Sequence, residues 1–512
     1  MTAIRQRYER SETARQPFLD RARDAAKLTI PSLLPPDGHS AHSKLYTPYQ
    51  GIGARGINNL SSKMLLALLP PNSPFFRLTV DDFKLQELAQ EEGARAEVED
   101  ALSSIERAVM SEIESSSTRI AAFEALKHLL VAGNVLLYQP DKGGMRVFHL
   151  DRYIIKRDPM GNALEIITQE EIAPSALPEE IRALLEEPTS ESSVNEDEPV
   201  KLYTQVVRRD GKWHVSQEVA GIPVPEATGT FPLDKSPYIP LRLSRIDGES
   251  YGRGYVEEYQ GDLNSLETLT QAIVEAAAAS AKVLFLVRPN GTTRARVLSE
   301  APNGAIREGD AADVSTLQVQ KSGDMQIAFQ SSQEIKERLS YAFLMNSSVQ
   351  RNAERVTAEE IRYMASELED ALGGIYSILS QEFQLPLVNR LLLQMQKQKK
   401  VPQLPKGVVS PTIVTGLEAL GRGHDLNKLS AMLDHLQPLG PEAIQKYMNV
   451  GDYIQRVGTS LGMDMDGLIK SDEQMQQEEQ QAMAMQTGQQ LAPQAFDAMK
   501  EQMTAQQGNE QT

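Results

Sequence analysis

The chain has 512 residues, of which 40% are hydrophobic and 24% are charged, a composition typical of soluble globular proteins with roughly three or four folding units. It contains no cysteine, which excludes disulfides, thiolate metal sites and cysteine nucleophiles. Its formal net charge of −18 argues against a simple nucleic-acid coat protein, because such a protein carries a basic surface.

The N-terminal part of the chain, residues 1–135, has the apolar spacing of α-helices. The first residues, MTAIRQRYER, lack the apolar run of a secretory signal, and no apolar run in the chain reaches the length of a membrane span. Helices are predicted over residues 5–30, 51–69, 93–117 and 117–132. The second of these places Ile57, Leu60, Met64 and Leu68 on one face and ends before two prolines.

The pattern changes to strands between residues 135 and 245. Apolar and polar residues alternate in NVLLYQP and in VKLYTQVVRRDGKWHVSQEVAG, and the turn signals GG, PMGN and RDGK break the runs. A small β-rich unit is therefore predicted here, with an acidic, serine-rich surface loop inside it. The fold class expected for the whole chain is mainly α with a smaller β-rich part, α+β.

Helical spacing returns from Gly252 to about Ala281, and the run Ala276–Ala279 gives that helix a smooth face of small residues. Such a face permits close packing against a neighbouring helix, and core packing within one chain is the competing account. The next residues, VLFLVRPNGTTRARVLSEAPNGAIREGDAADVSTLQVQ, predict short strands joined by two Asn-Gly turns. Another helix is predicted over residues 331–346.

A short polar break, NSSVQRNAERVTAEEI at residues 346–361, holds Arg351 and Arg355. Thr357 and Glu360 form a capping-box pattern that starts a helix running to about Lys400. Gly373–Gly374 and Pro386 should bend this helix without ending it. A compact helical unit is expected at about 408–470, and the Gln- and Met-rich residues 473–512 are expected to be weakly ordered.

Motifs that would indicate catalysis are absent from the sequence. None of the seven histidines falls in a metal-binding spacing, and neither a GxxxxGK[ST] phosphate loop nor a G-x-S-x-G elbow occurs. The glycine-rich stretches IDGESYGRG (246–254) and GIGARG (51–56) do not match a dinucleotide fingerprint and are interpreted as structural turns. No catalytic residue, metal site or cofactor is therefore predicted.

Four long stretches together resemble the portal, or head-to-tail connector, family of short-tailed, T-seven-like phages. They are ARGINNLSSKMLLALLPP, FEALKHLLVAGNVLLY, RIDGESYGRGYVEEYQGDL and NSSVQRNAERVTAEEIRYMASELEDALGGIYSILSQEFQLPLV. The similarity runs from about residue 5 to about residue 470. It implies a ring, typically of twelve identical subunits, at one vertex of the capsid. Double-stranded DNA enters the head through its central channel during packaging and leaves by the same route.

The resemblance also implies a portal fold with wing, stem, clip and crown. The expected parts are residues 1–250, wing, with helical bundle and β-rich unit; 251–286, first stem helix; 287–328, clip; 329–346, second stem helix; 347–356, tunnel loop; 357–402, long bent wing helix; 403–470, crown; and 471–512, flexible tail.

Candidate functional residues follow from that division. In the tunnel loop, the residues expected to contact DNA are Gln350, Arg351, Asn352 and Arg355. In the clip, the residues expected to dock partners, and to make this segment locally basic, are Arg288, Arg294, Arg296 and Arg307. In the stem, the residues expected to pack between subunits are Ala276, Ala277, Ala278 and Ala279. The loop arginines could instead pair with nearby glutamates, and the clip arginines could belong to a salt-bridged rim.

The function implied is a structural conduit and not an enzyme, because ATP hydrolysis in this family belongs to a separate motor. Implied partners are further copies of the chain, double-stranded DNA, the terminase large subunit, major capsid and scaffolding proteins, and tail adaptor and internal core proteins, with no membrane involved. The protein is expected in the virion after assembly in the host bacterial cytoplasm. Two alternatives remain open, namely a metal- or nucleotide-dependent DNA-processing enzyme and a generic helical interaction scaffold.

Overall fold

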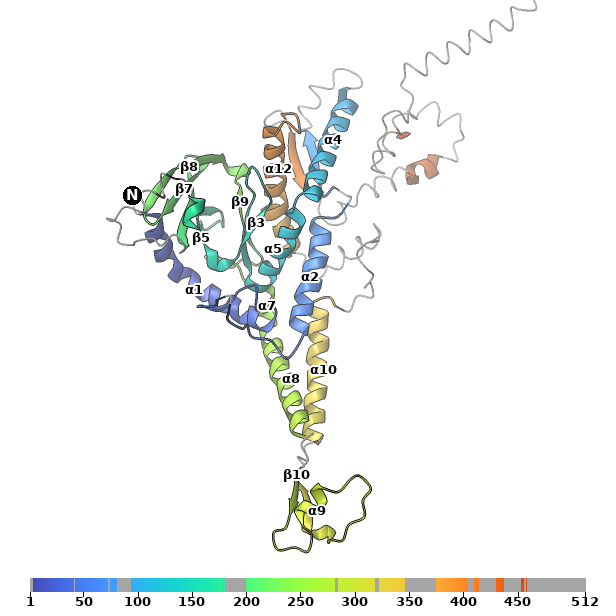
Figure 1. The fold of residues 1–512 in the computed structure, drawn as a ribbon. Helices are drawn as coiled ribbons and strands as arrows, with labels where there is room; N and C mark the ends of the chain where they lie inside the picture. The colour runs from blue at the N-terminus through green and yellow to red at the C-terminus, as the bar shows by residue number, and fades with distance from the viewer. Residues whose placement is uncertain are drawn as a thin grey trace, which may run out of the picture. The chain divides into compact units, whose positions relative to one another are not determined.

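The computed structural model contains two compact units, residues 1–419 and 420–512, and each is described by itself. The structure describes residues 3–40, 42–71, 74–80, 94–177, 179, 182, 199–280, 284–317, 322–345, 374–403, 409–413, 430–436, 453–454 and 457. In the second unit, residues 430–436 are helical. The elements below belong to the first unit, and Figure 1 shows their arrangement.

Among the described residues of the N-terminal part, four helices lie at the positions that the apolar spacing predicts. They are α1 (Ile4–Leu28), α2 (Ile52–Leu68), α4 (Ala94–Ser115) and α5 (Thr118–Ala132). The predicted apolar face of α2 is buried, since Ile57, Leu60 and Leu68 are 0% exposed. Helix α5 ends at Gly133, which adopts a left-handed conformation (φ 71°) that glycine reaches without strain.

A three-stranded antiparallel sheet follows α5, in the order β3-β2-β9. Its strands are β2 (Asn134–Tyr138), β3 (Arg146–Phe148) and β9 (Tyr238–Arg242). The central strand β2 is buried along nearly its whole length. Its continuous apolar run, NVLLY, is what a strand covered on both faces requires.

A second sheet has five strands that follow one another as an antiparallel meander, β4-β5-β6-β7-β8. Its strands are β4 (Tyr153–Arg157), β5 (Ala163–Ile172), β6 (Val200–Arg209), β7 (Lys212–Val219) and β8 (Ile222–Pro232). The turn Asp210–Gly211 has positive φ at both residues, as a tight hairpin needs. The strands expected between residues 135 and 245 are thus confirmed, but they form two sheets where one β-rich unit was predicted.

The main core lies between helices α1, α2 and α5, the three-stranded sheet and the C-terminal helix α12 (Leu385–Lys397). A five-residue π-helical segment, Ser380–Gln384, leads directly into α12. The helix continues through Pro386, as predicted. The predicted start of the long helix at Thr357 and its bend at Gly373 lie outside the described residues.

An antiparallel pair of short strands joins segments far apart in the chain. Strand β1 (Phe76–Val80) pairs with β12 (Val409–Ile413), and Phe76 lies opposite Ile413. The prediction that the unit at 408–470 is helical from its start is therefore wrong for residues 409–413. These residues have backbone partners on β1, and the strand's β-branched residues suit that pairing.

Two long helices, α8 (Gln260–Ser280) and α10 (Ser322–Ala342), lie side by side and are called the helical pair below (Figure 1). A single turn, α7 (Tyr255–Glu258), precedes α8, so the helix predicted from Gly252 to about Ala281 is interrupted at Tyr259. Helix α10 begins nine residues before the predicted 331. Its first turn holds Asp324, a carboxylate that stabilises a helix N-terminus.

Between these helices in sequence lies a small unit, residues 284–317, called the β10–β11 unit. Strand β10 (Leu284–Val287) pairs antiparallel with β11 (Val314–Leu317), and the short helix α9 (Ala295–Ser299) lies between them in sequence. Strands joined by two Asn-Gly turns were predicted here, but the described residues hold one strand at each end with a helical turn between. Short 3₁₀ turns occur at Leu150–Arg152, Pro174–Ala176, Leu233–Lys235 and Ala311–Asp313. Among the helices that the structure describes, none combines the length and apolar character needed to cross a membrane.

Candidate functional site

The helical pair buries little and exposes large apolar side chains. The side chains of Ile327, Phe329 and Tyr341 on α10 are 67%, 55% and 71% exposed, and Val274 on α8 is 50% exposed. In contrast, Leu339 of α10 is completely buried. Large apolar groups at this density on one element are typical of a surface that binds another protein.

The same two helices are strongly acidic. Residues 260–280 and 322–342 together contain six acidic and two basic residues. One of the two basic residues, Arg338, forms an ion pair of 2.8 Å with Asp262 between the helices. Both partners are partly exposed, so the pair contributes little stability, and the surface of the helices stays negative.

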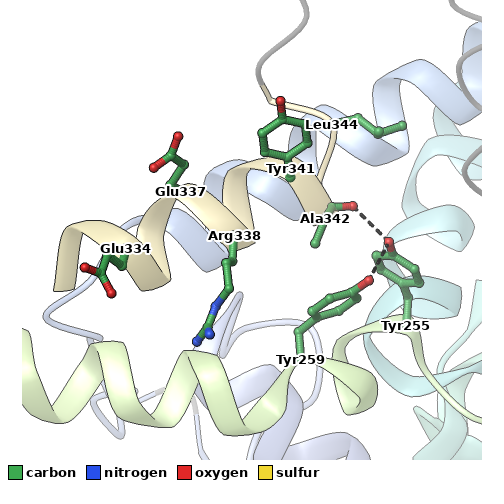
Figure 2. Close-up of a pocket in the computed structure, with 8 residues that line it drawn as sticks. All are labelled: Tyr255, Tyr259, Glu334, Glu337, Arg338, Tyr341, Ala342 and Leu344. Atoms are coloured by element: carbon green, nitrogen blue, oxygen red, sulfur yellow. Dashed lines mark hydrogen bonds between the residues drawn. The ribbon is translucent and has the colours of Figure 1, made fainter. Parts of the chain in front are cut away.

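An open pocket of about 740 Å³ lies at the base of the helical pair (Figure 2). It is lined by Tyr255, Tyr259, Glu334, Glu337, Arg338, Tyr341, Ala342 and Leu344. The Tyr255 hydroxyl donates a hydrogen bond of 2.9 Å to the Ala342 carbonyl and lies 3.4 Å from the Tyr259 hydroxyl. Burial, with the Tyr259 hydrogen bond, raises the pKa of Tyr255, so its phenol stays protonated. The pocket therefore offers aromatic edges and two carboxylates as a contact surface.

Helix α8 is anchored by a buried carboxylate that sequence reasoning missed. Glu267 is 7% exposed and accepts three hydrogen bonds, from the Tyr46 hydroxyl (2.6 Å) and from the backbone amides of Tyr49 (2.9 Å) and Gln50 (3.1 Å). The hydrogen bond to Glu267 raises the pKa of Tyr46 to about 12. A glutamate on a helix gives no local sign of such partners, because they come from a segment more than 200 residues away.

The predicted stem residues, Ala276–Ala279, form the last turns of α8. Ala276 is half-buried, and Ala277, Ala278 and Ala279 are exposed. The structure therefore leaves three of the four alanines open to a neighbouring helix.

In the β10–β11 unit the most highly bonded side chain is Asp313. Its carboxylate accepts hydrogen bonds from the backbone amides of Thr292 (2.7 Å) and Thr293 (3.1 Å). The backbone bond from Thr293, with those from Thr292 and the nearby charge of Arg288, lowers the pKa of Asp313. These hydrogen bonds join the residues after the Asn290–Gly291 turn to the residue just before β11. The sequence pattern did not predict this connection.

The four arginines expected to dock partners are all exposed in this unit. The prediction that they make the segment locally basic is wrong. Residues 284–317 hold Arg288, Arg294, Arg296 and Arg307, but also Glu300, Glu308, Asp310 and Asp313. Arg296 pairs with Glu300 at 2.9 Å, with both side chains exposed. The formal charge of residues 284–317 is therefore zero, whereas the helices on either side of them in sequence, α8 and α10, are acidic.

The residues expected in the tunnel loop, Gln350, Arg351, Asn352 and Arg355, lie outside the described residues. The described residues on either side of them are Met345, just after α10, and Gly374.

Both glycine-rich stretches are closed by the protein's own backbone. Gly252 donates its amide to the Asn134 side chain at 2.7 Å, and a side chain at Gly254 would collide with the carbonyl oxygen of Val131. Gly53 likewise lies against the Leu28 carbonyl oxygen. Interpretation of these stretches as structural turns therefore agrees with the structure, since Gly53, Gly252 and Gly254 are each packed against the protein's own backbone.

Histidine and carboxylate clusters do not point to chemistry in the part of the chain that the structure describes. No group of three or more potential metal ligands occurs among these residues. His128 is buried, and its ring stacks on that of the half-buried His149 with ring centroids 6.1 Å apart. Burial, with the neighbouring His149, lowers the pKa of His128 to about 3, so the pair is neutral inside the fold.

Comparison with known proteins identifies relatives along nearly the whole chain. The portal protein of Escherichia phage T7 is 46% identical over 486 residues, which cover 93% of this chain and 90% of that protein. The portal protein of Enterobacteria phage SP6 is 33% identical over 94% of this chain and 92% of its own length. A solved structure, the neck of an empty gene transfer agent particle, is 12% identical with a TM-score of 0.37, covering 75% of this chain and 86% of that chain, and nothing is inferred from it.

A family profile described as bacteriophage head to tail connecting protein matches residues 1–469. The match covers most of the chain, including the core helices, both sheets, the helical pair and the β10–β11 unit. The chain therefore belongs to the bacteriophage head to tail connecting protein family.

Proposed function

We propose that this chain is a portal vertex protein, which forms a homo-oligomeric ring through which double-stranded DNA enters and leaves the phage head. The observation that carries the proposal is the identity of 46% with the T7 portal protein over 93% of the chain. Ring assembly agrees with the exposed apolar side chains of the helical pair, since Ile327 and Phe329 need other chains to bury them. The role is that of a structural conduit, and a separate motor supplies ATP hydrolysis.

In this proposal the helical pair is the stem, the β10–β11 unit the clip, and residues 1–250 with the long helix at 357–402 the wing. Residues 347–356 are the tunnel loop, 403–470 the crown and 471–512 the tail. Side-by-side packing of stems from neighbouring subunits brings Ala277–Ala279 against a second copy, where small side chains permit close approach of the helices.

The acidic helices suit a channel that must not bind DNA tightly. Each phosphate that a protein cation neutralises releases counterions and adds affinity, so a basic wall would hold the duplex. The helical pair carries six acidic and only two basic residues. In the proposed channel, Arg351 and Arg355 supply a local, sequence-independent contact with the phosphate backbone.

The proposed partners follow from the position of each part. The clip, with Arg288, Arg294, Arg296 and Arg307 exposed, docks the terminase large subunit during packaging and the tail adaptor afterwards. The wing meets the major capsid and scaffolding proteins, and internal core proteins bind on the head side. Assembly takes place in the host bacterial cytoplasm, and the finished protein lies at the head-to-tail vertex of the virion.

The proposal is tested by electron microscopy of the purified full chain together with a mass measurement of the particles. Hollow rings with a bore wide enough for a double helix are expected, with a mass that is an integral multiple of 56.7 kDa. A chain that remains monomeric at all concentrations and salt conditions would refute it.

The role of the loop arginines needs a separate experiment. The double variant Arg351→Ala/Arg355→Ala is expected to form rings normally but to package or retain less DNA. Arg209→Ala, which removes an exposed arginine at the end of β6, serves as the matched control and should package and retain DNA normally. Normal packaging by the double loop variant would exclude the loop contact while leaving the ring intact.

A further inference from the structure

Helix α2 contacts the chain immediately before and after the segment 346–373, which contains the loop arginines. At the first end, the Asn59 side chain donates hydrogen bonds to the carbonyls of Phe343 (2.9 Å) and Leu344 (3.0 Å). The Lys63 ammonium donates to the same Leu344 carbonyl at 2.9 Å. Residues 59 and 63 are one helical turn apart, so both project from the same face of α2.

These bonds satisfy carbonyls that the end of α10 leaves without helical partners. Leu344 has a positive φ of 52°, which ends the helix, and its carbonyl cannot continue the α-helical pattern. A lysine suits this place because a helix C-terminus carries a partial negative charge. Lys63 is only 6% exposed, so its ammonium is removed from water and depends on such acceptors.

Gly56, one turn before Asn59 on α2, brings the two helices into contact. A Cβ atom at this position would lie 2.5 Å from the ring of Phe343, closer than real contacts allow. Phe343 itself is completely buried. The end of α10 therefore sits directly on the backbone of α2.

At the other end of the segment, the returning chain binds the C-terminus of the same helix. The Tyr376 hydroxyl donates to the Ala67 carbonyl at 3.0 Å, and the Gln384 side-chain amide donates to the Leu68 carbonyl at 2.6 Å. Gln384 is 0% exposed. The last carbonyls of α2, which have no partners within the helix, thus bind two side chains of the returning helix.

The π-helical segment Ser380–Gln384 explains how both side chains reach α2. In a regular α-helix, residues eight apart, such as Tyr376 and Gln384, differ by about 80° around the axis. One π turn accommodates an extra residue, so the separation behaves as seven residues and the difference falls to about 20°. The π segment therefore turns Gln384 to the face that carries Tyr376.

We propose that α2 is a positioning clamp that holds the two described stretches of chain on either side of the segment 346–373, Phe343–Met345 and Tyr376–Gln384, in a fixed relation to each other. The two contact points on α2, at Asn59 and Leu68, are nine residues or about 13 Å apart along one rigid helix. A single helix, α2, therefore binds the chain at both ends of the segment. The inference deepens the proposed function and rests on it for the role of the loop arginines. The clamp itself rests only on the hydrogen bonds and contacts of α2 given above.

A purely structural role for α2 would predict a different behaviour. Its buried apolar face, with Ile57 and Leu60, holds α2 in the main core independently of Asn59, Lys63 and the carbonyls of its last turn. Loss of the clamp bonds should then loosen the ends of the segment while the main core remains folded. Loss of a core contact should instead lower protection everywhere.

The test compares Lys63→Met and Gln384→Met with Ser61→Ala by amide hydrogen exchange of the full-length protein. Ser61 is buried on the same helix, and its hydroxyl has no hydrogen-bond partner among the described residues. Lys63→Met is expected to speed exchange of the Phe343, Leu344 and Met345 amides, which are hydrogen-bonded in the structure, about tenfold. Lys63→Arg, which keeps a cationic donor, should restore protection, and Ser61→Ala should change nothing.

A distance measurement provides the second readout. Because the chain has no cysteine, nitroxide labels attach only to the two cysteines introduced by Tyr341→Cys and Gly374→Cys, near the two ends of the segment. Tyr341 is 71% exposed, and a side chain at Gly374 meets open space. With labelled chains diluted into an excess of unlabelled chains, the distance distribution is expected to be narrow and to broaden in Lys63→Met and in Gln384→Met. The double variant should add little, since release of one end already frees the segment.

The outcomes separate the clamp from the proposed DNA contact. Faster exchange confined to the segment's ends, with a broader distance distribution, supports the clamp whether or not DNA retention changes. Exchange that is unchanged, or equally faster in the main core, overturns it. A clamp variant with loosened ends and normal DNA retention would count against the loop arginines and leave the clamp standing.

Discussion

The main core and the helical pair differ in how far their large side chains are exposed. In the main core even arginines are buried, as Arg15 and Arg390 are each 1% exposed. In the helical pair, apolar groups such as Ile327 and Phe329 are more than half exposed. The core is thus complete within one chain. The pair has the surface of an element that is completed by other chains, which is what the proposed ring requires.

The largest expected difference between the two regions concerns a single arginine in each. Arg15 directs its guanidinium at the Tyr8 hydroxyl (2.9 Å) and the Asp151 carbonyl (2.6 Å) from a fully buried position. Arg15→Ala should lower the free energy of unfolding by about 3–5 kcal/mol, because buried acceptors lose their donor. Arg338→Ala, on the exposed helical pair, should cost less than about 1 kcal/mol. Urea unfolding of both variants checks this, and equal costs would contradict the contrast.

Two glycines give the next largest effect. A methyl group at Gly254 would collide with the backbone of Val131, which cannot move without disturbing α5. Gly254→Ala should therefore destabilise the main core by about 3 kcal/mol. At Gly261 on α8 a side chain meets open space, so Gly261→Ala should be neutral or should stabilise the helix by up to about 1 kcal/mol. Thermal unfolding of the two variants measures the loss of stability expected for Gly254→Ala and the unchanged or higher stability expected for Gly261→Ala.

The buried His128 makes the main core sensitive to acid. Burial lowers the pKa of His128 from 6.5 to about 3, so the folded chain keeps this residue neutral while the unfolded chain binds a proton below pH 6.5. Stability should therefore fall as the pH falls from about 6.5 towards 3, by about 2 kcal/mol from this residue between pH 7 and pH 5. His128→Leu should reduce that loss. An identical pH dependence in the variant would show that another group is responsible.

The sequence predicts those parts of the fold that depend on the spacing of apolar and polar residues along a short stretch of chain. The buried face of α2, Ile57 to Leu68, and the meander of the five-stranded sheet follow from apolar spacing and turn residues alone. The pairing of β1 with β12 does not, because Phe76 and Ile413 are joined only through the tertiary fold. Helix α10 begins at Ser322 for a related reason, since packing against α8 extends it beyond its strongest apolar pattern.

The candidate site shows the same limit. The alanines of α8 could be placed on a helix from sequence, and three of them are exposed. The basic character of the β10–β11 unit was wrong because the arginines were considered without their acidic neighbours, such as Glu300. Glu267, Asn59 and Lys63 were missed because their partners lie more than 200 residues away. Local sequence carries no trace of such contacts.

A smaller, local effect is expected in the β10–β11 unit. Asp313→Asn keeps the size of the side chain but loses the charge that the amides of Thr292 and Thr293 stabilise. Exchange of these two amides should become faster, while the main core is unaffected. The pKa of Asp313 is lowered, so the wild-type bonds should hold above its ordinary value of 3.8 and weaken only as the pH falls through the lowered pKa. Glu308→Gln, an exposed neighbour, is the control and should change neither amide.

The smallest effect on the single chain should come from the change that most disturbs assembly. Ala278 is exposed on α8, so a phenylalanine there should alter the free energy of unfolding by no more than about 0.5 kcal/mol, the cost of its lower helix propensity. Between chains the same ring would keep neighbouring helices apart. Sedimentation of Ala278→Phe should therefore show folded chains that fail to form rings, whereas Ala278→Ser, which keeps the residue small, should assemble. If Ala278→Phe lost folding and assembly equally, the alanines would belong to packing within one chain, and the helical pair would need another face to meet its neighbours.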